Sequence, residues 1–229
     1  MSRIAAVLLS IVSVGVLAAG SMASARADAT PESLVTRFHA KKIRMPASYR
    51  ARRHLEAENQ RFNKSGWIDV VTEFAADRLS YTVTGRGGSE LVQSQVLLPA
   101  LDGERELWAE GREPFALTDA NYQLEDATPD SAGVPRIRLP PRREDRRLID
   151  GWMLLSPDAE VLQVSGRLAK SPSFWTRSVM LSQRYTSIRG VHLPISVTSV
   201  ADVRVVGRST FRMTYTYELV DGVRVGNSM

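Results

Sequence analysis

The stretch that decides the fold class is TFRMTYTYEL, at positions 210–219. Its large apolar side chains fall at every second position, with Thr, Arg and Glu between them. Successive side chains of a β-strand point to opposite faces, so this pattern predicts a strand with one buried and one solvated face. The predicted buried face carries Phe211, Met213, Tyr215, Tyr217 and Leu219.

Similar segments precede this one, back to Leu148, and turns containing Gly, Pro, Asp or Ser separate them. The expected strands cover residues 148–155, 160–168, 175–185, 195–203 and 207–219. Turns at this regular spacing favour a mainly β, antiparallel sheet over βαβ units. A shorter strand is expected at 136–139.

The first half of the chain predicts one hairpin and several helices. Residues 47–62 are rich in Ala, Arg, Glu and Leu, which favour a basic, peripheral helix. Residues 67–74 and 79–84 alternate as the two strands of a hairpin. Ser89 caps an amphipathic helix that Pro99 is expected to kink or end, and Gly103 permits a second short helix through Leu107 and Trp108. Both helices are expected to cover the apolar face of the sheet. We therefore expect an N-terminal extension at 28–65 and a β domain at 66–229.

The N-terminus has the features of a secretory signal peptide. Arg3 precedes an uncharged apolar run at 4–19, and Ala25-Arg26-Ala27 offers small residues for cleavage. The alternative is a membrane anchor, but a run of about 16 residues is shorter than the roughly 20 needed to span a bilayer. We expect residues 1–27 to be removed, leaving no transmembrane span.

Charge and cysteine content narrow the functional classes. The chain has 30 Lys and Arg against 25 Asp and Glu, and loss of Arg3 and Arg26 leaves an excess of +3. This excess is too small to predict a nucleic-acid partner. The absence of cysteine excludes thiol nucleophiles, Cys-ligated zinc and lipidation on a cysteine.

The residues indicate no catalytic constellation. His39, His54 and His192 are not at metal-ligand spacing, and His192 is expected in a solvent-facing turn. Two carboxylate pairs, Asp69 with Glu73 and Glu104 with Glu106, favour solvated positions over acid–base chemistry. We expect a protein that is not an enzyme and has no cofactor and no metal.

Two local features favour binding. The cluster Arg142–Arg147 holds four arginines around two acids, and it predicts either a soluble hairpin tip or a surface for an acidic partner or lipid headgroups. Phe174 and Trp175 follow a connection that contains proline, where polar residues are usual. They are expected either to anchor the end of the core or to line the mouth of an apolar cavity.

The order of elements and two short motifs resemble a known family. The segments Gly151–Asp158 and Gly190–Pro194 look like a strand-turn and a "GV.LP" turn of the LolA/LolB-like periplasmic lipoprotein carriers, and the chain is also similar to the N-terminal domain of RseB-like regulators. The resemblance covers roughly residues 67–219. It implies an unclosed β half-barrel, covered by lid helices, in the Gram-negative periplasm.

The resemblance further implies an apolar cavity that holds an acyl chain, in lipoprotein or lipid handling. Alternation alone predicts the residues that line the cavity, with Phe174 and Trp175 at the rim: Leu154, Val164, Val179, Leu181, Phe211, Met213 and Tyr215. A second hypothesis is a non-catalytic module, with a self-filled cavity, that binds an envelope protein through the basic helix and the Arg142–Arg147 cluster.

Overall fold

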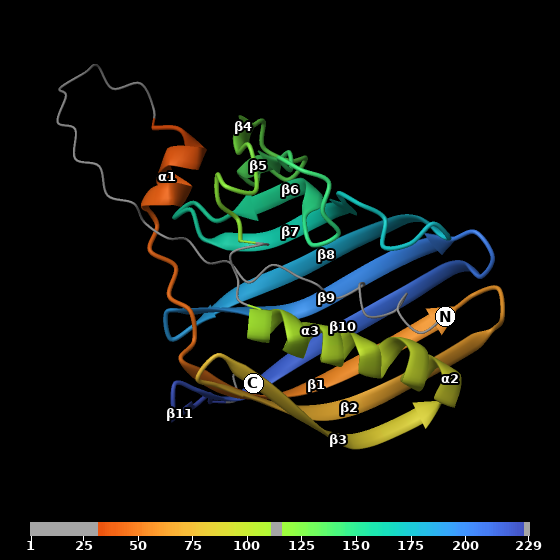
Figure 1. Ribbon diagram of the computed structural model, residues 1–229. Helices are drawn as coiled ribbons and strands as arrows, with labels where there is room; N and C mark the ends of the chain where they lie inside the picture. The colour runs from red at the N-terminus through yellow and green to blue at the C-terminus, as the bar shows by residue number, and fades with distance from the viewer. Residues whose placement is uncertain (1–31, 111–115, 227–229) are drawn as a thin grey trace.

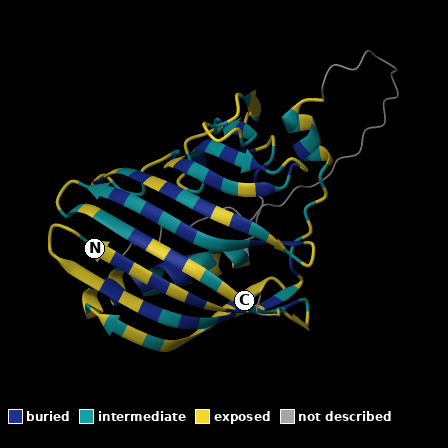
Figure 2. Ribbon diagram, turned by 180° about the vertical axis from the view of Figure 1, so that it is seen from behind, coloured by how far each residue is buried: buried dark blue, intermediate teal, exposed yellow. Residues whose placement is uncertain are grey.

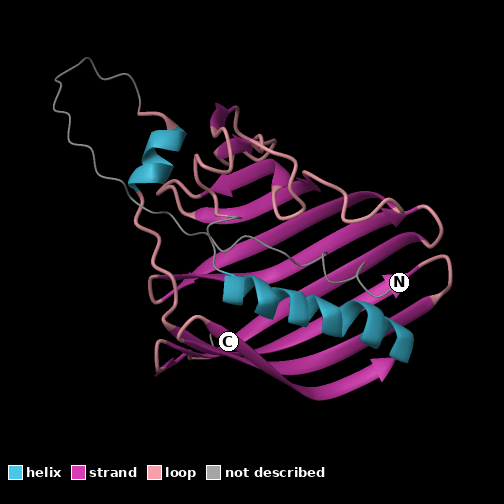
Figure 3. Ribbon diagram, in the orientation of Figure 1, coloured by secondary structure: helices cyan, strands magenta, loops and turns pink. Residues whose placement is uncertain are grey.

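The computed structural model describes residues 32–110 and 116–226, and the predicted signal peptide lies outside them. Eleven antiparallel strands form one sheet in the order β3-β2-β1-β10-β9-β8-β7-β6-β5-β4, with β11 paired to β10. The sheet curves around the long helix α3 without closing (Figures 1 and 3). The prediction of a mainly β, unclosed half-barrel covered by a helix is therefore confirmed.

The strands are β1 (Ser48–Asn59), β2 (Lys64–Ala75), β3 (Arg78–Gly88), β4 (Glu125–Ala127), β5 (Arg136–Leu139), β6 (Ile149–Leu155), β7 (Val161–Leu168), β8 (Thr176–Ile188), β9 (Val191–Val203), β10 (Gly207–Val220) and β11 (Val223–Arg224). The predicted hairpin and the predicted strand run after Leu148 are present. Strand β9 begins four residues earlier than expected. His192 is therefore a buried strand residue, and its prediction as a solvent-facing turn residue is wrong.

The predicted helix at 47–62 is also wrong, because these residues form β1, which lies between β2 and β10. Helix propensity is a weak preference that tertiary context overrides. Here Ala51, Arg53, Leu55 and Ala57 are buried while the residues between them are exposed. Pairing on both sides satisfies the backbone of β1, so the β domain begins at Ser48, and a boundary at residue 66 would divide paired strands.

Three consecutive helical segments follow β3: α2 (Glu90–Val92), the π-helix η1 (Gln93–Leu97) and α3 (Leu98–Glu110). Pro99 has no backbone N–H to donate within a helix, yet the helix continues through it. It is the second residue of α3 and lies two positions after the end of η1, where the i→i+5 pattern already departs from α-helical bonding. A separate short helix, α1 (Leu34–Ala40), is capped by the Ser33 hydroxyl, which accepts from the Thr36 N–H.

The inner face of the sheet is the side on which α3 lies, and it carries most of the core. A row of paired residues on this face crosses the sheet through Ala57, Phe211, Ser199, Leu181, Gly166 and Gly151. Burial alternates along the strands on either side of this row (Figure 2). The core extends from Leu55 and Ile68 on one side to Met153 and Ile137 on the other. Within residues 32–110 and 116–226, no helix is long and apolar enough to cross a membrane.

Candidate functional site

The most unusual residue of the inner face is Arg53, near the middle of β1. Its side chain is 0% exposed, and it stands between the buried Ala51 and Leu55. Its partners across the sheet are Val70 on β2 and Tyr215 on β10. Burying a charged group costs free energy unless the group is paired, so the contacts of Arg53 must compensate for its burial.

The Arg53 guanidinium joins the sheet to α3. Its Nη1 donates to Glu104 Oε2 at 2.6 Å, and its Nη2 donates to the Tyr49 hydroxyl at 2.9 Å. Its Cζ lies 4.5 Å from the centre of the Tyr215 ring, which is cation–π distance. Burial acts to lower the pKa of Arg53, but Glu104 and the two tyrosines outweigh it, so the pKa is raised and the guanidinium stays charged.

Aromatic side chains surround this ion pair. Tyr49 stacks on Phe74 at 5.3 Å and meets Tyr217 edge-on at 5.6 Å. Phe74 in turn contacts Trp108, near the end of α3, with ring centres 4.4 Å apart. Burial raises the pKa of the Tyr215 and Tyr217 hydroxyls, so both stay neutral. The ion pair and this cluster of rings thus hold α3 on the sheet, together with the buried Leu101 and a hydrogen bond from the Tyr81 hydroxyl to Asp102.

Several buried polar atoms on the inner face have no hydrogen-bond partner among the described residues. They are Nε of Arg53, Oγ1 of Thr72, Oγ of Ser199 and Oε1 of Gln183. Such groups are usually satisfied, because leaving one unpaired costs about 1–3 kcal/mol. They come from β1, β2, β9 and β8. Atoms that could still form a hydrogen bond are therefore spread across an otherwise apolar face.

The predicted lining residues mostly lie together on this face. Val164, Val179, Leu181, Phe211 and Met213 are buried in one core cluster, and Tyr215 packs against it. Leu154 was assigned to the wrong face. It pairs with Gln163 and lies on the outer face, while its neighbour Met153 is buried in the cluster.

Phe174 and Trp175 are in the connection between β7 and β8, outside the inner face. Phe174 is 74% exposed and Trp175 50%, and their rings meet edge-on at 5.5 Å. They do not anchor the core, because their side chains are largely in solvent.

The two features that favoured a protein-binding module both make contacts within the chain. The basic helix is the strand β1. In the Arg142–Arg147 cluster, Arg147 pairs with Asp145, Arg143 donates to Asn121 Oδ1, and Arg142 donates to the Asp119 and Tyr122 carbonyls. Arg147 holds the pKa of Asp145 down, at about 2. Three of the four arginines therefore contact their own chain.

Four acids were expected in solvated positions, and this is wrong for Glu104, whose side chain is only 17% exposed. Glu104 faces Arg53, Asp69 contacts His54 at 2.7 Å, and Glu73 pairs with Arg50. Each of these acids has its own partner, which gives no support to a shared acid–base role.

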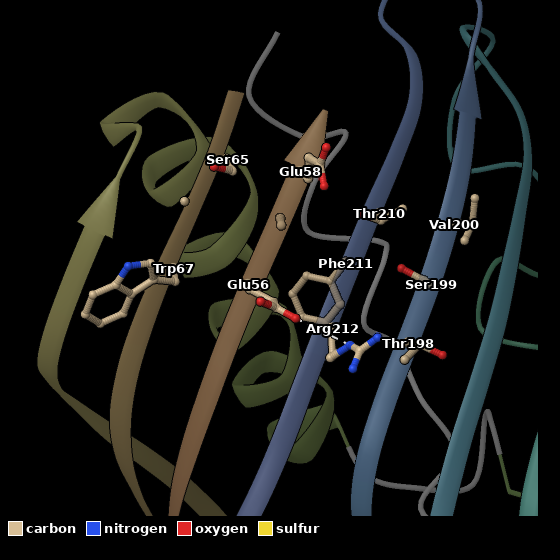
Figure 4. Close-up of a pocket in the computed structure, with 12 residues that line it drawn as sticks. Glu56, Glu58, Ser65, Trp67, Thr198, Ser199, Val200, Thr210, Phe211 and Arg212 are labelled. Carbon is tan, nitrogen blue, oxygen red and sulfur yellow. Dashed lines mark ion pairs between the residues drawn. The ribbon is translucent and has the colours of Figure 1, made fainter. Parts of the chain in front are cut away.

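A hollow of about 420 Å³ lies over β2, β1, β10 and β9 (Figure 4). Its lining includes the ion pair of Glu56 with Arg212, at 3.4 Å, and the exposed aromatic side chain of Trp67. These three residues alternate with buried ones, so they belong to the outer face. The lining mixes these charged groups with apolar residues such as Val200 and Phe211, so the hollow is not the apolar cavity that was predicted.

Sequence reasoning missed Arg53, Tyr49 and Glu104. The available signal was the alternation at 51–57, where arginine takes one position of an otherwise small and apolar row. Glu104 could not be linked to it, because the two lie 51 residues apart in the chain. No family model matches this chain, and no curated protein matches it significantly.

Proposed function

We propose that the protein binds an amphiphile with an acyl chain on the inner face of the half-barrel, beneath α3, and handles lipid or lipoprotein in the periplasm. The observation that carries the proposal is a charged arginine, fully buried in the centre of an apolar, curved sheet. Apolar surface alone would suit any greasy ligand. A guanidinium at its centre suits one with an anionic group.

The apolar part of the face supplies the binding energy. Burying each CH₂ group is worth about 0.8 kcal/mol, so a long acyl chain can compete with the side chains of the helix for this surface. The partnerless polar atoms of Ser199 and Gln183 would accept the hydrogen bonds of a headgroup or its linkage.

The Arg53–Glu104 pair gives the site a means of opening. An incoming carboxylate or phosphate can replace Glu104 as the partner of Arg53, and this exchange removes one of the contacts that hold α3 on the sheet. The cost of exposing the buried charge is avoided, because the guanidinium keeps an anionic partner throughout.

The test is uptake of a fluorescent fatty acid and of the matching fatty alcohol, with native mass spectrometry to count bound ligand. We expect both probes to bind, the acid more tightly. Arg53→Met should abolish the preference for the acid. The matched control is Arg52→Met, one position along β1 and on the outer face, where Arg52 pairs with Glu218.

Absence of uptake of either probe by the unchanged chain would refute the proposed function. Equal binding of acid and alcohol would keep the acyl site and remove the role given to Arg53.

A further inference from the structure

We infer that one end of the half-barrel docks on the surface of an anionic phospholipid bilayer. This end, called here the aromatic tip, consists of residues 58–65, 169–178 and 202–209. It comprises the β1–β2, β7–β8 and β9–β10 connections and lies at the right of Figure 1. The inference does not depend on a ligand in the half-barrel, because the tip lies outside the inner face.

Contacts between the three connections make the tip one surface. Arg61 Nη1 donates to the Val205 carbonyl at 2.8 Å, and Asn59 donates to the Val206 carbonyl. The backbone N–H of Arg204 donates to the carbonyl of Trp175 at 2.8 Å. The Arg204 guanidinium lies 4.8 Å from the centre of the Phe174 ring. The exposed groups are therefore held together by hydrogen bonds between segments distant in sequence.

Large apolar side chains are concentrated here. Phe62, Phe174, Trp175 and Val205 are each at least half exposed. Soluble surfaces expose single apolar residues commonly, but a group of them with polar residues around it marks an interaction site. Aromatic rings, and Trp in particular, favour the headgroup region of a bilayer, where one part of the ring is apolar and the other polar.

The charge of the tip identifies the partner. Its basic residues are Arg61, Lys64, Lys170, Arg177, Arg204 and Arg208, and all six are exposed. Its acids are Glu58 and Asp202, so the tip has a net charge of +4. From Asp28 on, the rest of the chain has 22 basic and 23 acidic residues, a net charge of −1.

Counted from Asp28 on, the net positive charge of the chain thus comes from the end that exposes the aromatic rings. Basic residues next to an anionic membrane each add about fivefold to its binding at low salt. Rings that enter the headgroup layer and arginines that contact phosphates fit the same partner, and neither feature alone would specify it.

The opposite end of β10 offers a matched control. Val205 and Arg204 lie just before this strand, while Val223 and Arg224 lie just after it, and all four are exposed. The chain has no cysteine, so a single introduced cysteine can carry an environment-sensitive fluorophore. The N-terminal segment is common to all variants, so its own contribution to binding is the same in each.

The experiment uses the full chain with vesicles of phosphatidylcholine alone or mixed with phosphatidylglycerol. A label at Val205→Cys should increase and blue-shift its emission on the mixed vesicles, and a label at Val223→Cys should not. Arg204→Glu should weaken flotation with mixed vesicles by about fivefold or more, with Arg224→Glu unchanged. Added salt should weaken binding.

Equal responses from the two labels, equal effects of the two charge reversals, or no preference for anionic vesicles would each overturn the inference. Both reversals are at exposed positions, Arg204 in the β9–β10 turn and Arg224 in the two-residue strand β11, and unchanged thermal unfolding would show that the variants are folded. Binding to an acidic protein without any response to vesicles would also overturn it, in favour of a protein partner.

Discussion

Arg53 on β1 and Glu104 on α3, 51 residues apart, form a 2.6 Å ion pair in which the arginine side chain is 0% exposed and the glutamate 17%. This ion pair links the sheet to its covering helix, and a second polar contact lies on β3, where the Tyr81 hydroxyl donates to Asp102 of α3 at 2.8 Å. An ion pair in such a place adds little stability by itself, but removal of one partner leaves the other buried and uncompensated.

Removing the charge of Glu104 should therefore destabilise the fold and loosen α3. We expect Glu104→Gln to lower the free energy of unfolding by about 3–5 kcal/mol, because the guanidinium loses its counter-charge. Hydrogen exchange should accelerate in α3 before it does in β1. The double variant Arg53→Met/Glu104→Leu should recover most of the loss. Arg52→Met should stay within about 0.5 kcal/mol of the unchanged chain, and a similar loss there would contradict the special role of the pair.

Protonation of His192 should destabilise the fold in mild acid. Its ring stacks on Tyr185 at 4.6 Å, and burial lowers the pKa of the imidazole to about 4, which outweighs the opposite effect of Glu160. In the unfolded chain the imidazole binds a proton near pH 6.5. The stability that the neutral, buried His192 contributes is therefore complete above pH 6.5, and it is lost as the pH falls towards 4. Over this pH range, the free energy of unfolding of the unchanged chain should fall by about 3 kcal/mol more than that of His192→Phe. Urea unfolding at each pH gives the free energy of unfolding. If it changed with pH by the same amount in both chains, the role given to His192 would be refuted.

Gly151 and Gly166 should not tolerate a side chain. They face each other across β6 and β7, and a Cβ on Gly151 would overlap the Ser165 carbonyl oxygen. Gly151→Ala should cost about 3 kcal/mol or more, because backbone atoms cannot yield as a flexible side chain can. Gly226→Ala, with open space around it, is the control. A thermal unfolding temperature shared by both variants would show that the strands can separate locally.

Met153 and Leu154 distinguish the two faces of β6. Met153→Ala should cost about 2–5 kcal/mol, since the side chain is fully buried in the core cluster. Leu154→Ala should cost clearly less, because the side chain is on the outer face and half-buried. Denaturant unfolding of the two variants gives the comparison, and the reverse order would restore Leu154 to the lining of the cavity.

The error at Leu154 shows where alternation becomes ambiguous. The outer face of β6 carries the large Trp152, whose ring lies 4.3 Å from the Arg136 guanidinium, and the inner face carries Gly151. Each face of β6 therefore carries both large apolar residues and smaller or polar ones. The alternation of apolar residues along this strand does not show which face is buried. In β10, the face opposite the core is threonine and charge, and the prediction is right from Phe211 to Tyr217. At the end of the strand it is wrong, because the register shifts between Arg50 and Ala51, so that Leu219 pairs with the exposed Arg50 and Val220 is buried instead.

The sequence by itself determined the elements whose pattern is local. The alternation at 210–219, the regular turns after Leu148 and the hairpin at 67–84 predict paired strands without knowledge of their neighbours, because a half-buried strand requires a period of two. The amphipathic segment after Ser89 likewise predicted a helix on the sheet.

Only the tertiary structure decided the rest. Residues 48–59 favour a helix locally, but β2 and β10 bond the backbone of β1 on both sides, and the sheet buries its inner face. That placement puts Arg53 under α3, where Glu104, Tyr49 and Tyr215 surround it. Contacts between residues so far apart depend on how the whole chain closes, so no local pattern of residues specifies them.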